Sequence, residues 1–325
     1  MRWAGAGQVY RVESTTCNYC GSSSYTIVHT SGDAVFQDGE RFDIVRCTTC
    51  DLVYLSPRPS KDEMARYYPP EYQEEIRGLI DRLRSQPLLK LGLAMLRKRR
   101  TPPLSPPSSL LDIGCSHGDY LSFLQKAGWE VEGIELDPQA ARHAQEAGLR
   151  VHQGDAEELL ERLPSGRYNV VTMWHVLEHL YDPLGALREV YRILKPDGLL
   201  LLELPNSASV LARCLGRYWY PLEVPRHLYH FTPTTLSNML GAAGFRVCAI
   251  EGVPSPEVIL WSLRLLKNRV RPSAAGTPMS HPLVVNPLLA ALCFPPSWLL
   301  AKIAKGDHMS VRARKDEQRG THEHR

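Results

Sequence analysis

The sequence lacks a strong charge of either sign. Its 325 residues include 38 lysines and arginines against 35 aspartates and glutamates, which leaves a formal net charge of +3. Proteins that bind nucleic acids usually show a clear basic excess, because phosphate contacts supply much of their affinity. The charge balance therefore gives no support for a nucleic-acid partner, and we expect none.

Long apolar runs are missing as well. The N-terminus, Met-Arg-Trp-Ala-Gly, turns polar without the apolar stretch of a signal peptide, so we expect no secretion and a cytoplasmic location. The most apolar segment, 282–304, is interrupted by Pro287, Pro295 and Pro296, whereas a spanning helix needs about 20 continuous apolar residues. The alternatives for it are a lid or dimer surface, and a kinked hairpin lying peripherally on the inner face of the membrane.

Cysteine is present in a pattern typical of metal binding. Cys17-x-x-Cys20 and Cys47-x-x-Cys50 can each form a tight turn that directs two thiolates at one ion, and two such turns complete a closed tetrahedral site. We expect structural zinc there, with four free thiols as the alternative. Four further cysteines stand in apolar contexts and are expected to be small buried residues: Cys115, Cys214, Cys248 and Cys293.

The rest of the chain alternates strand-like and helix-like segments. Such alternation predicts an α/β fold with a mostly parallel sheet and helices on both faces, a Rossmann-like architecture. The last alternating segment, 309–314, is expected to be an edge strand. The expected limits are 12–58 for the cysteine module, 59–101 for a helical connector ending in the basic run 97–100, 105–315 for the α/β domain, 206–231 and 253–306 for insertions within it, and 316–325 for a polar tail.

Three strand ends of the α/β domain carry residues suited to a nucleotide-like ligand. The first strand, 110–113, leads into Gly114-Cys115-Ser116-His117-Gly118, where glycines allow close approach of the backbone. Glu135 ends the next strand, where a carboxylate can accept both hydroxyl protons of a ribose. Gly154-Asp155-Ala156 follows the third. An NAD-binding domain is the alternative, but the three-glycine dinucleotide fingerprint is absent.

Taken together, these motifs resemble those of class I S-adenosylmethionine-dependent methyltransferases. The similarity consists of Leu-Asp-Ile-Gly-Cys-x-x-Gly, Gly-Ile-Glu-Leu-Asp-Pro, Gly-Asp-Ala and Val-Leu-Glu-His, in order over about 105–252. Asn169 departs from the aspartate that often opens the fourth strand. The resemblance implies S-adenosylmethionine as cofactor, with contacts from Asp112, Gly114, Cys115 and Gly118 at the methionine end, Glu135 at the ribose, Asp155 and Ala156 near adenine, and Trp174 and His175 lining the pocket.

The order of a zinc ribbon followed by a methyltransferase domain is similar to the deoxysugar C-methyltransferases. Arg226-His227-Leu228-Tyr229-His230-Phe231 resembles the Glu-His-x-x-Tyr-Phe segment of that family, which implies His227 as the base, with His230 and Tyr220 as further catalytic candidates. A histidine suits this role because its pKa lies near neutrality. The alternative is that His227 and His230 hold the insertion in place. Arg226 is expected either to bind a phosphate or carboxylate of the substrate or to be a solvated loop charge.

The acceptor class stays open between alternatives. We expect a methyltransferase acting on a small molecule, either sugar-linked or another secondary metabolite. The first alternative is O-methylation of a lipid or quinone-type acceptor at the membrane surface, which the apolar segment 282–304 favours. The basic run 97–100 is expected either to touch an anionic membrane or to be a solvated helix end. The second is a cofactor-binding scaffold without activity, whose zinc module recruits a protein.

Overall fold

The computed structural model describes residues 2–5, 8–33, 40–69, 98–270, 287–303 and 306–316. Most of the predicted helical connector, at 70–97, and nearly all of the predicted polar tail, at 317–325, lie outside the described residues. The chain divides into two compact units, of which the first comprises 1–96, 205–235 and 252–308, and the second 97–204, 236–251 and 309–325. The predicted domain limits themselves stay predictions.

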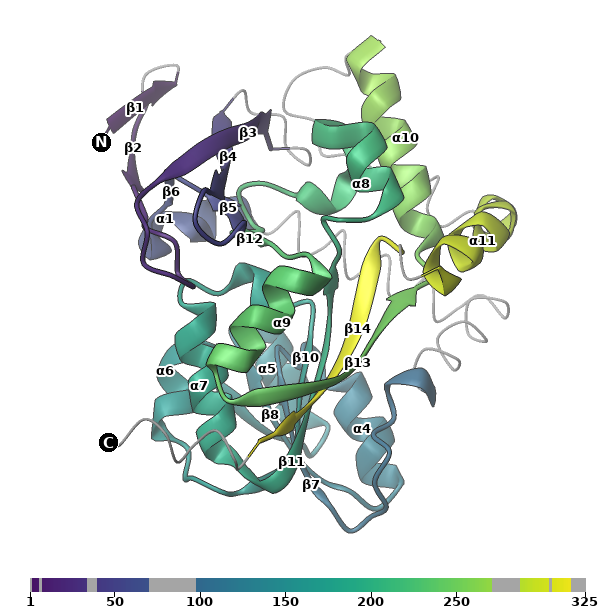
Figure 1. The fold of residues 1–325 in the computed structure, drawn as a ribbon. Helices are drawn as coiled ribbons and strands as arrows, with labels where there is room; N and C mark the ends of the chain where they lie inside the picture. Colours follow the sequence, from purple (N-terminus) through teal and green to yellow (C-terminus); the bar gives the residue numbers. More distant parts are fainter. Residues whose placement is uncertain are drawn as a thin grey trace. The chain divides into compact units, whose positions relative to one another are not determined.

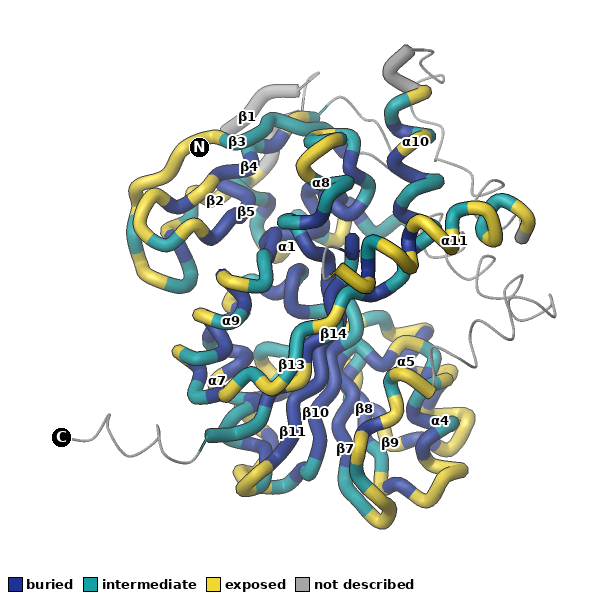
Figure 2. The backbone as a smooth tube through the Cα atoms, turned by 45° about the vertical axis from the view of Figure 1, so that its right-hand side comes forward, coloured by how far each residue is buried: buried dark blue, intermediate teal, exposed yellow. Residues whose placement is uncertain are grey.

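A seven-stranded sheet forms the core of the second unit (Figures 1 and 2). Its order is β13 (Phe245–Val253), β14 (His308–Lys315), β11 (Leu194–Pro205), β10 (Tyr168–Trp174), β7 (Ser109–Ile113), β8 (Glu130–Glu135) and β9 (Arg150–Gln153). The five strands from β11 to β9 pair in parallel. Neighbouring residues such as Leu110 and Leu111 are both fully buried, because both faces of the sheet are covered. The predicted Rossmann-like fold is confirmed.

Helices follow the strands of this sheet. They are α4 (Asp119–Lys126), α5 (Pro138–Glu146), α6 (Ala156–Arg162), α7 (Pro183–Ile193) and α9 (Pro233–Ala242). Figure 2 shows α4 and α5 on one side of the strands and α7 and α9 on the other. Their starts are encoded locally: Asp137 and Asp182 cap α5 and α7, and a proline occupies the first helical turn. Thr232 caps α9, since its Oγ1 accepts a hydrogen bond from the Thr235 amide.

The last strand lies at a different place from the one the sequence predicts. β14 is not at the edge of the sheet but between β11 and β13. Met309, Val311 and Ala313 are buried while Arg312 is exposed, so the alternation was interpreted correctly as one buried face. Alternation carries no information about backbone pairing, however, and both edges of this strand are paired. The arrows of β13 and β14 point in opposite directions in Figure 1.

Two small sheets belong to the first unit. One contains β1 (Arg2–Gly5), β2 (Gln8–Glu13) and β6 (Arg58–Pro59), followed by the short helix α1 (Lys61–Met64) and a 3₁₀ turn, Ala65–Tyr67. The other has the order β12 (Tyr229–His230), β5 (Val53–Leu55), β4 (Arg41–Cys47) and β3 (Tyr25–Gly32). β12 comes from the predicted insertion 206–231 and places Tyr229 opposite Tyr54. The insertion therefore completes a sheet of the cysteine module.

The insertions also supply α8 (Val210–Leu215), 3₁₀ turns at Gly216–Tyr218 and Tyr220–Leu222, α10 (Pro256–Val270) and α11 (Pro287–Lys302). The kinked hairpin, one of the two alternatives for 282–304, is wrong over 287–302, where one helix continues through Pro295 and Pro296. Both prolines are exposed, so water can satisfy the carbonyls that lose their helical partners. Within the described residues, no helix has the length and apolarity to cross a membrane.

Candidate functional site

The turn after β7 requires glycine at two positions. Gly114 has φ +72°, and a Cβ there would lie 2.5 Å from Val176 Cγ2. Gly118 has φ +79°, and a Cβ there would lie 2.3 Å from Leu149 Cδ1. An L side chain is disfavoured by the backbone and excluded by the space at both positions. The turn therefore runs tightly across the carboxyl edge of the sheet, where parallel α/β folds bind ligands.

Glu135 joins this turn to the beginning of α5. Its carboxylate accepts hydrogen bonds from the backbone amides of Ser116, at 2.7 Å, and Asp137, at 2.9 Å. Burial raises the pKa of the Glu135 carboxyl, against the effect of these amides. Cys115 packs over β8, where a Cβ on Gly133 would lie 2.5 Å from its Sγ. The structure thus brings the predicted turn at 114–118 together with Glu135, the residue predicted to bind the ribose.

Asp155, the predicted adenine contact, has a structural duty that sequence reasoning missed. Its Oδ1 accepts hydrogen bonds from the amides of Glu157, at 2.9 Å, and Glu158, at 3.3 Å, and so caps α6. Ala156 is the first residue of that helix. The Gly154 amide donates to the Glu135 carbonyl, which holds this loop beside the end of β8. Contact of Asp155 and Ala156 with adenine stays a prediction.

Asp112 lies inside the sheet, beside β10. Its side chain is buried, and Thr172 Oγ1 donates a hydrogen bond to Oδ1 at 2.6 Å. Burial raises the pKa of Asp112 to about 7, against the effects of Thr172 and of the Arg100 charge. Its predicted role at the methionine end of the cofactor is not tested by this geometry.

Trp174 ends β10 beside two residues that the motifs did not indicate. The Arg100 guanidinium lies over its ring, 4.7 Å from the centroid, and the Tyr120 ring meets it edge-on at 5.7 Å. Trp174 Nε1 and Arg100 Nε are both buried and have no hydrogen-bond partner among the described residues. Buried donors normally have an acceptor. These two donors mark a place where an acceptor, preferably anionic, would fit.

His175, which is half-buried, and Glu203, which is buried, form the centre of a charge cluster. His175 has φ +59°, and its two ring nitrogens each lie 3.5 Å from a carboxylate, that of Glu178 for Nδ1 and that of Glu203 for Nε2. Burial favours the neutral ring, but the two carboxylates raise the pKa of His175 to about 9. The raised pKa favours the charged ring at neutral pH. The predicted place of His175 in the cofactor pocket stays a prediction.

Glu203 also pairs with the basic run that precedes β7. Arg100 lies 2.6 Å from its carboxylate and Arg99 donates to its other oxygen. Burial alone would raise the pKa of Glu203, but His175 and the two arginines hold it well below its usual range. The interpretation of 97–100 as a solvated helix end or membrane contact is therefore wrong for Arg99 and Arg100. A sequence shows no sign of this pairing, because Arg100 and Glu203 stand 103 residues apart.

The predicted base, His227, is buried in the first unit with 6% of its surface exposed. Its Nδ1 lies 2.8 Å from the Pro221 carbonyl oxygen, and its Nε2 lies 3.7 Å from Glu223 Oε2. A carbonyl only accepts, so Nδ1 carries a proton, and Nε2 is the basic nitrogen of the neutral ring. This tautomer is compatible with the predicted role, which nothing in the geometry tests.

Packing contacts hold the two other catalytic candidates. Tyr220 stacks on Trp261, with ring centroids 5.1 Å apart and an interplanar angle of 15°, and its amide donates to Ser262 Oγ. His230 is buried in β12 and pairs with Val53 of β5. Both side chains therefore contribute to the structure of the first unit, and their catalytic assignment stays a prediction.

The structure contradicts both expectations for Arg226. It is fully buried, and its guanidinium donates to both oxygens of Asp33, at 2.8 and 2.9 Å. It also donates to Glu223 Oε1 at 3.1 Å and to the Tyr67 carbonyl. These acceptors occupy N–H donors on all three nitrogens of the guanidinium group. Arg226 is therefore neither a substrate ligand nor a solvated charge, but an ion pair between the insertion and the N-terminal segment.

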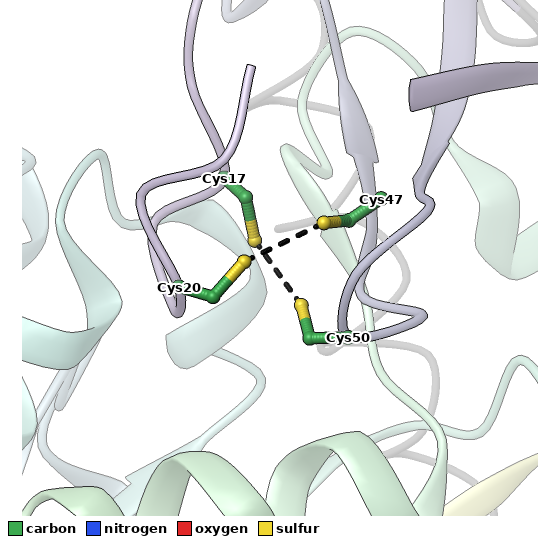
Figure 3. A group of neighbouring side chains, drawn as sticks. All are labelled: Cys17, Cys20, Cys47 and Cys50. Atoms are coloured by element: carbon green, nitrogen blue, oxygen red, sulfur yellow. Dashed lines mark hydrogen bonds between the residues drawn. The ribbon is translucent and has the colours of Figure 1, made fainter. Parts of the chain in front are cut away.

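The four paired cysteines converge on one point (Figure 3). Their sulfurs lie within 4.8 Å of one another, with 3.4 Å between Cys17 and Cys50 and 3.5 Å between Cys20 and Cys47. Sulfurs 2.3 Å from a tetrahedral zinc are separated by about 3.8 Å, so this cluster nearly matches the required size. Burial opposes ionisation of Cys47, but the Thr49 and Cys50 amides and neighbouring thiols lower its pKa to about 7. The residues therefore fit zinc.

The other cysteines follow the expectation only in part. Cys115 is buried as predicted, but Cys214 and Cys248 are exposed and Cys293 is half-buried. Cys248 lies on β13, on the side of the strand that faces away from the core, and Cys214 is near the end of α8. An apolar sequence context therefore did not determine burial at these positions.

Comparison with known proteins gives matches to methyltransferases. A family model described as a methyltransferase domain matches residues 80–250, which is more than half of the chain. Ubiquinone biosynthesis O-methyltransferase of Azorhizobium caulinodans is 33% identical over 156 residues, 44% of this chain and 61% of the relative. The protein of the same name from Aeromonas salmonicida is 32% identical over 156 residues, 44% of this chain and 65% of the relative.

The chain thus spans less than two thirds of the length of these relatives. Among solved structures, a SAM-dependent methyltransferase from Archaeoglobus fulgidus matches 70% of this chain and 94% of its own, with 23% identity and a TM-score of 0.47.

Proposed function

Because the chain belongs to the methyltransferase-domain family and is an S-adenosylmethionine-dependent methyltransferase by that membership, we propose that it methylates a small-molecule acceptor. The observation that carries this proposal is the placement of Glu135 against the Gly114–Gly118 turn at the carboxyl edge of the sheet. A carboxylate at this position can accept both hydroxyl protons of the cofactor's ribose.

The buried donors beside β10 support the same cofactor. S-adenosylmethionine carries a carboxylate on its methionine part, and Arg100 Nε with Trp174 Nε1 would donate to it. The cofactor supplies a methyl group on a sulfonium, which is already a good leaving group. The protein then has to orient the acceptor and, where the attacking atom bears a proton, to remove it. We assign this proton removal to Nε2 of His227. The alternative is that His227 only holds the insertion 206–231 in place.

Calorimetry with S-adenosylmethionine tests the cofactor site. Glu135→Ala should weaken binding by about 1–3 kcal/mol, the scale for lost hydrogen bonds to a charged group. Glu146→Ala, on the exposed side of α5, is the matched control and should bind as the unmodified protein does. Binding of NAD in place of S-adenosylmethionine would contradict the proposal.

The second part of the proposal is one structural zinc ion held by Cys17, Cys20, Cys47 and Cys50. Four thiolates leave no open coordination position, so the ion would stabilise the module and take no part in the reaction. Elemental analysis should give about one zinc per chain. Cys47→Ser should lower this value, whereas Cys248→Ser, on an exposed cysteine, should not. Full occupancy in the Cys47 variant would overturn the assignment.

For the acceptor, one observation favours the lipid or quinone class over a sugar-linked metabolite. α11 turns its small residues Ser297 and Ala301 inward and leaves large apolar side chains exposed, including Leu288 at 73% and Leu292 at 72%. Such a face suits the surface of a membrane, where apolar acceptors reside. The curated relatives are named for O-methylation in ubiquinone biosynthesis, which agrees with this class.

Turnover with labelled cofactor distinguishes the two acceptor classes. Phenolic quinone precursors in lipid vesicles should be methylated, and Leu292→Glu should reduce that rate without changing the rate on a soluble phenol. Methylation of sugar nucleotides alone would show that the lipid or quinone class is wrong. No turnover with either class, despite cofactor binding, would favour the scaffold function.

A further inference from the structure

A cavity in the first unit is lined by none of the residues assigned above to methyl transfer. It has a volume of about 540 Å³ and lies between β3, the start of β4, and α8 with the turn that follows it. These three elements lie side by side in Figure 1. Pockets for small molecules typically measure about 300–1,000 Å³. The cavity is therefore large enough for a ligand of several phosphate groups or of nucleotide size.

The lining of this cavity is cationic. Arg41, Arg213 and Arg217 contribute to it, and no aspartate or glutamate does. Arg41 donates to the Thr30 carbonyl at 3.1 Å, and the Arg217 guanidinium lies over the Tyr218 ring at 5.5 Å. None of the three arginines forms an ion pair with a carboxylate in the described part of the chain. All three are exposed, so their charges face solvent at the cavity, in contrast to that of the buried Arg226.

Two neutral features shape the wall between the arginines. His29 is held neutral because burial and then the Arg217 charge lower its pKa, so it adds hydrogen-bonding capacity without further repulsion. Gly216 has φ +52° and ψ −120°, a conformation open only to glycine, and a Cβ there would lie 3.4 Å from His29 Cε1. Glycine thereby lets the backbone of the turn approach His29 and bring Arg217 to the cavity.

We propose that this cavity, defined by His29, Arg41, Arg213 and Arg217, binds a phosphate-bearing small molecule, with a diphosphate as the preferred group. Guanidinium groups bind phosphate oxygens in a bidentate manner. A terminal phosphate carries about −1.5 to −2 charges at neutral pH, so a diphosphate balances three arginines. The inference does not rest on the proposed methyl transfer. The shared chemistry belongs equally to a soluble diphosphate and to the phosphate headgroup of a lipid.

Binding of inorganic pyrophosphate to the full chain, measured by calorimetry at low salt, tests the site. Arg213→Gln and Arg217→Gln should each weaken binding by about tenfold, the scale for a lost hydrogen bond to a charged group. Arg162→Gln is the matched control, since Arg162 is an exposed helical arginine that does not line the cavity. Cosedimentation with phosphatidic acid vesicles, against phosphatidylcholine vesicles, forms the lipid arm.

The outcomes separate the sources of the phosphate. Loss of pyrophosphate binding in the two variants supports a soluble ligand. Loss of binding to phosphatidic acid vesicles, with no pyrophosphate binding in any protein, supports a lipid headgroup. Absence of both, or binding that the variants and the control weaken alike, overturns the proposal. Zinc content, measured on the same samples, shows that the first unit is folded in the variants. Retained S-adenosylmethionine affinity shows that a failure here leaves the proposed function intact.

Discussion

Each of the two units contains a cluster of buried charges, and the clusters differ in how completely their donors are satisfied. In the first unit, Arg226 donates to Asp33, Glu223 and a backbone carbonyl. In the second, Glu203 accepts from Arg99 and Arg100, while Arg100 Nε and Trp174 Nε1 keep no acceptor among the described residues. A cluster in which every group is paired holds a fold together. A cluster with spare donors is prepared for a ligand.

The largest effect should come from breaking the satisfied cluster. Arg226→Met leaves the Asp33 carboxylate buried without its partner, so the free energy of unfolding should fall by about 3–5 kcal/mol. Denaturant unfolding measures this loss. The double variant Arg226→Met with Asp33→Leu removes both charges and should recover most of the stability. A loss below about 1 kcal/mol in the single variant would mean that the pair is solvated.

Next in size is the effect of His227→Ala on turnover. His227 touches the satisfied cluster through Glu223, so this variant asks whether that cluster also serves chemistry. With the acceptor identified, turnover should fall by about a hundredfold, the usual scale for a positioned base, and cofactor affinity should stay unchanged. The acidic limb of the pH–rate profile should disappear. Near-normal turnover would make His227 a structural residue.

A smaller effect is expected from Trp174→Phe in the unsatisfied cluster. The substitution keeps an aromatic ring under Arg100 and removes only the Nε1 donor. S-adenosylmethionine affinity should fall by about 1–3 kcal/mol if that donor binds the cofactor carboxylate, and the free energy of unfolding should hardly change. Calorimetry with Trp261→Phe, in the first unit, supplies the control. Equal affinity in both variants would remove Trp174 from the cofactor site.

The second cluster should also affect the pH dependence of stability. Because the pKa of His175 is raised from 6.5 to about 9 in the folded protein, its contribution is fully present below pH 6.5 and is lost as the pH rises through 9. Asparagine tolerates the left-handed backbone at this position. The free energy of unfolding of the His175→Asn variant should therefore fall less between pH 6.5 and 9.5 than that of the unmodified protein. Unfolding curves at both pH values measure this difference. Parallel losses would show that the ring is neutral.

Sequence reasoning predicted the local structure of the 114–118 turn and its neighbouring strand ends well, because each of these parts is local. Strand ends, glycines with positive φ and helix caps are encoded within a few residues, as Gly114, Gly118 and Thr232 show. The helix α6 escaped notice because Asp155 was interpreted only as a cofactor ligand and not as the cap that begins it.

The charge clusters could not be predicted in the same way. Arg226 pairs with a residue 193 positions away, and Arg100 with one 103 positions away. Nothing local distinguishes such arginines from solvated ones, and tertiary packing alone selects their partners. The same holds for the arginines of the proposed phosphate site, which have no carboxylate partner among the described residues.

The interior position of β14 has a consequence for the order of folding. Its neighbours β11 and β13 are separated in the sheet until residues 308–315 enter between them. During synthesis, both neighbours are therefore made well before the strand that joins them, and each exposes an unpaired edge at which strands of other chains can add. The nascent protein is most prone to aggregate in that interval, and the last strand closes both edges in a single step.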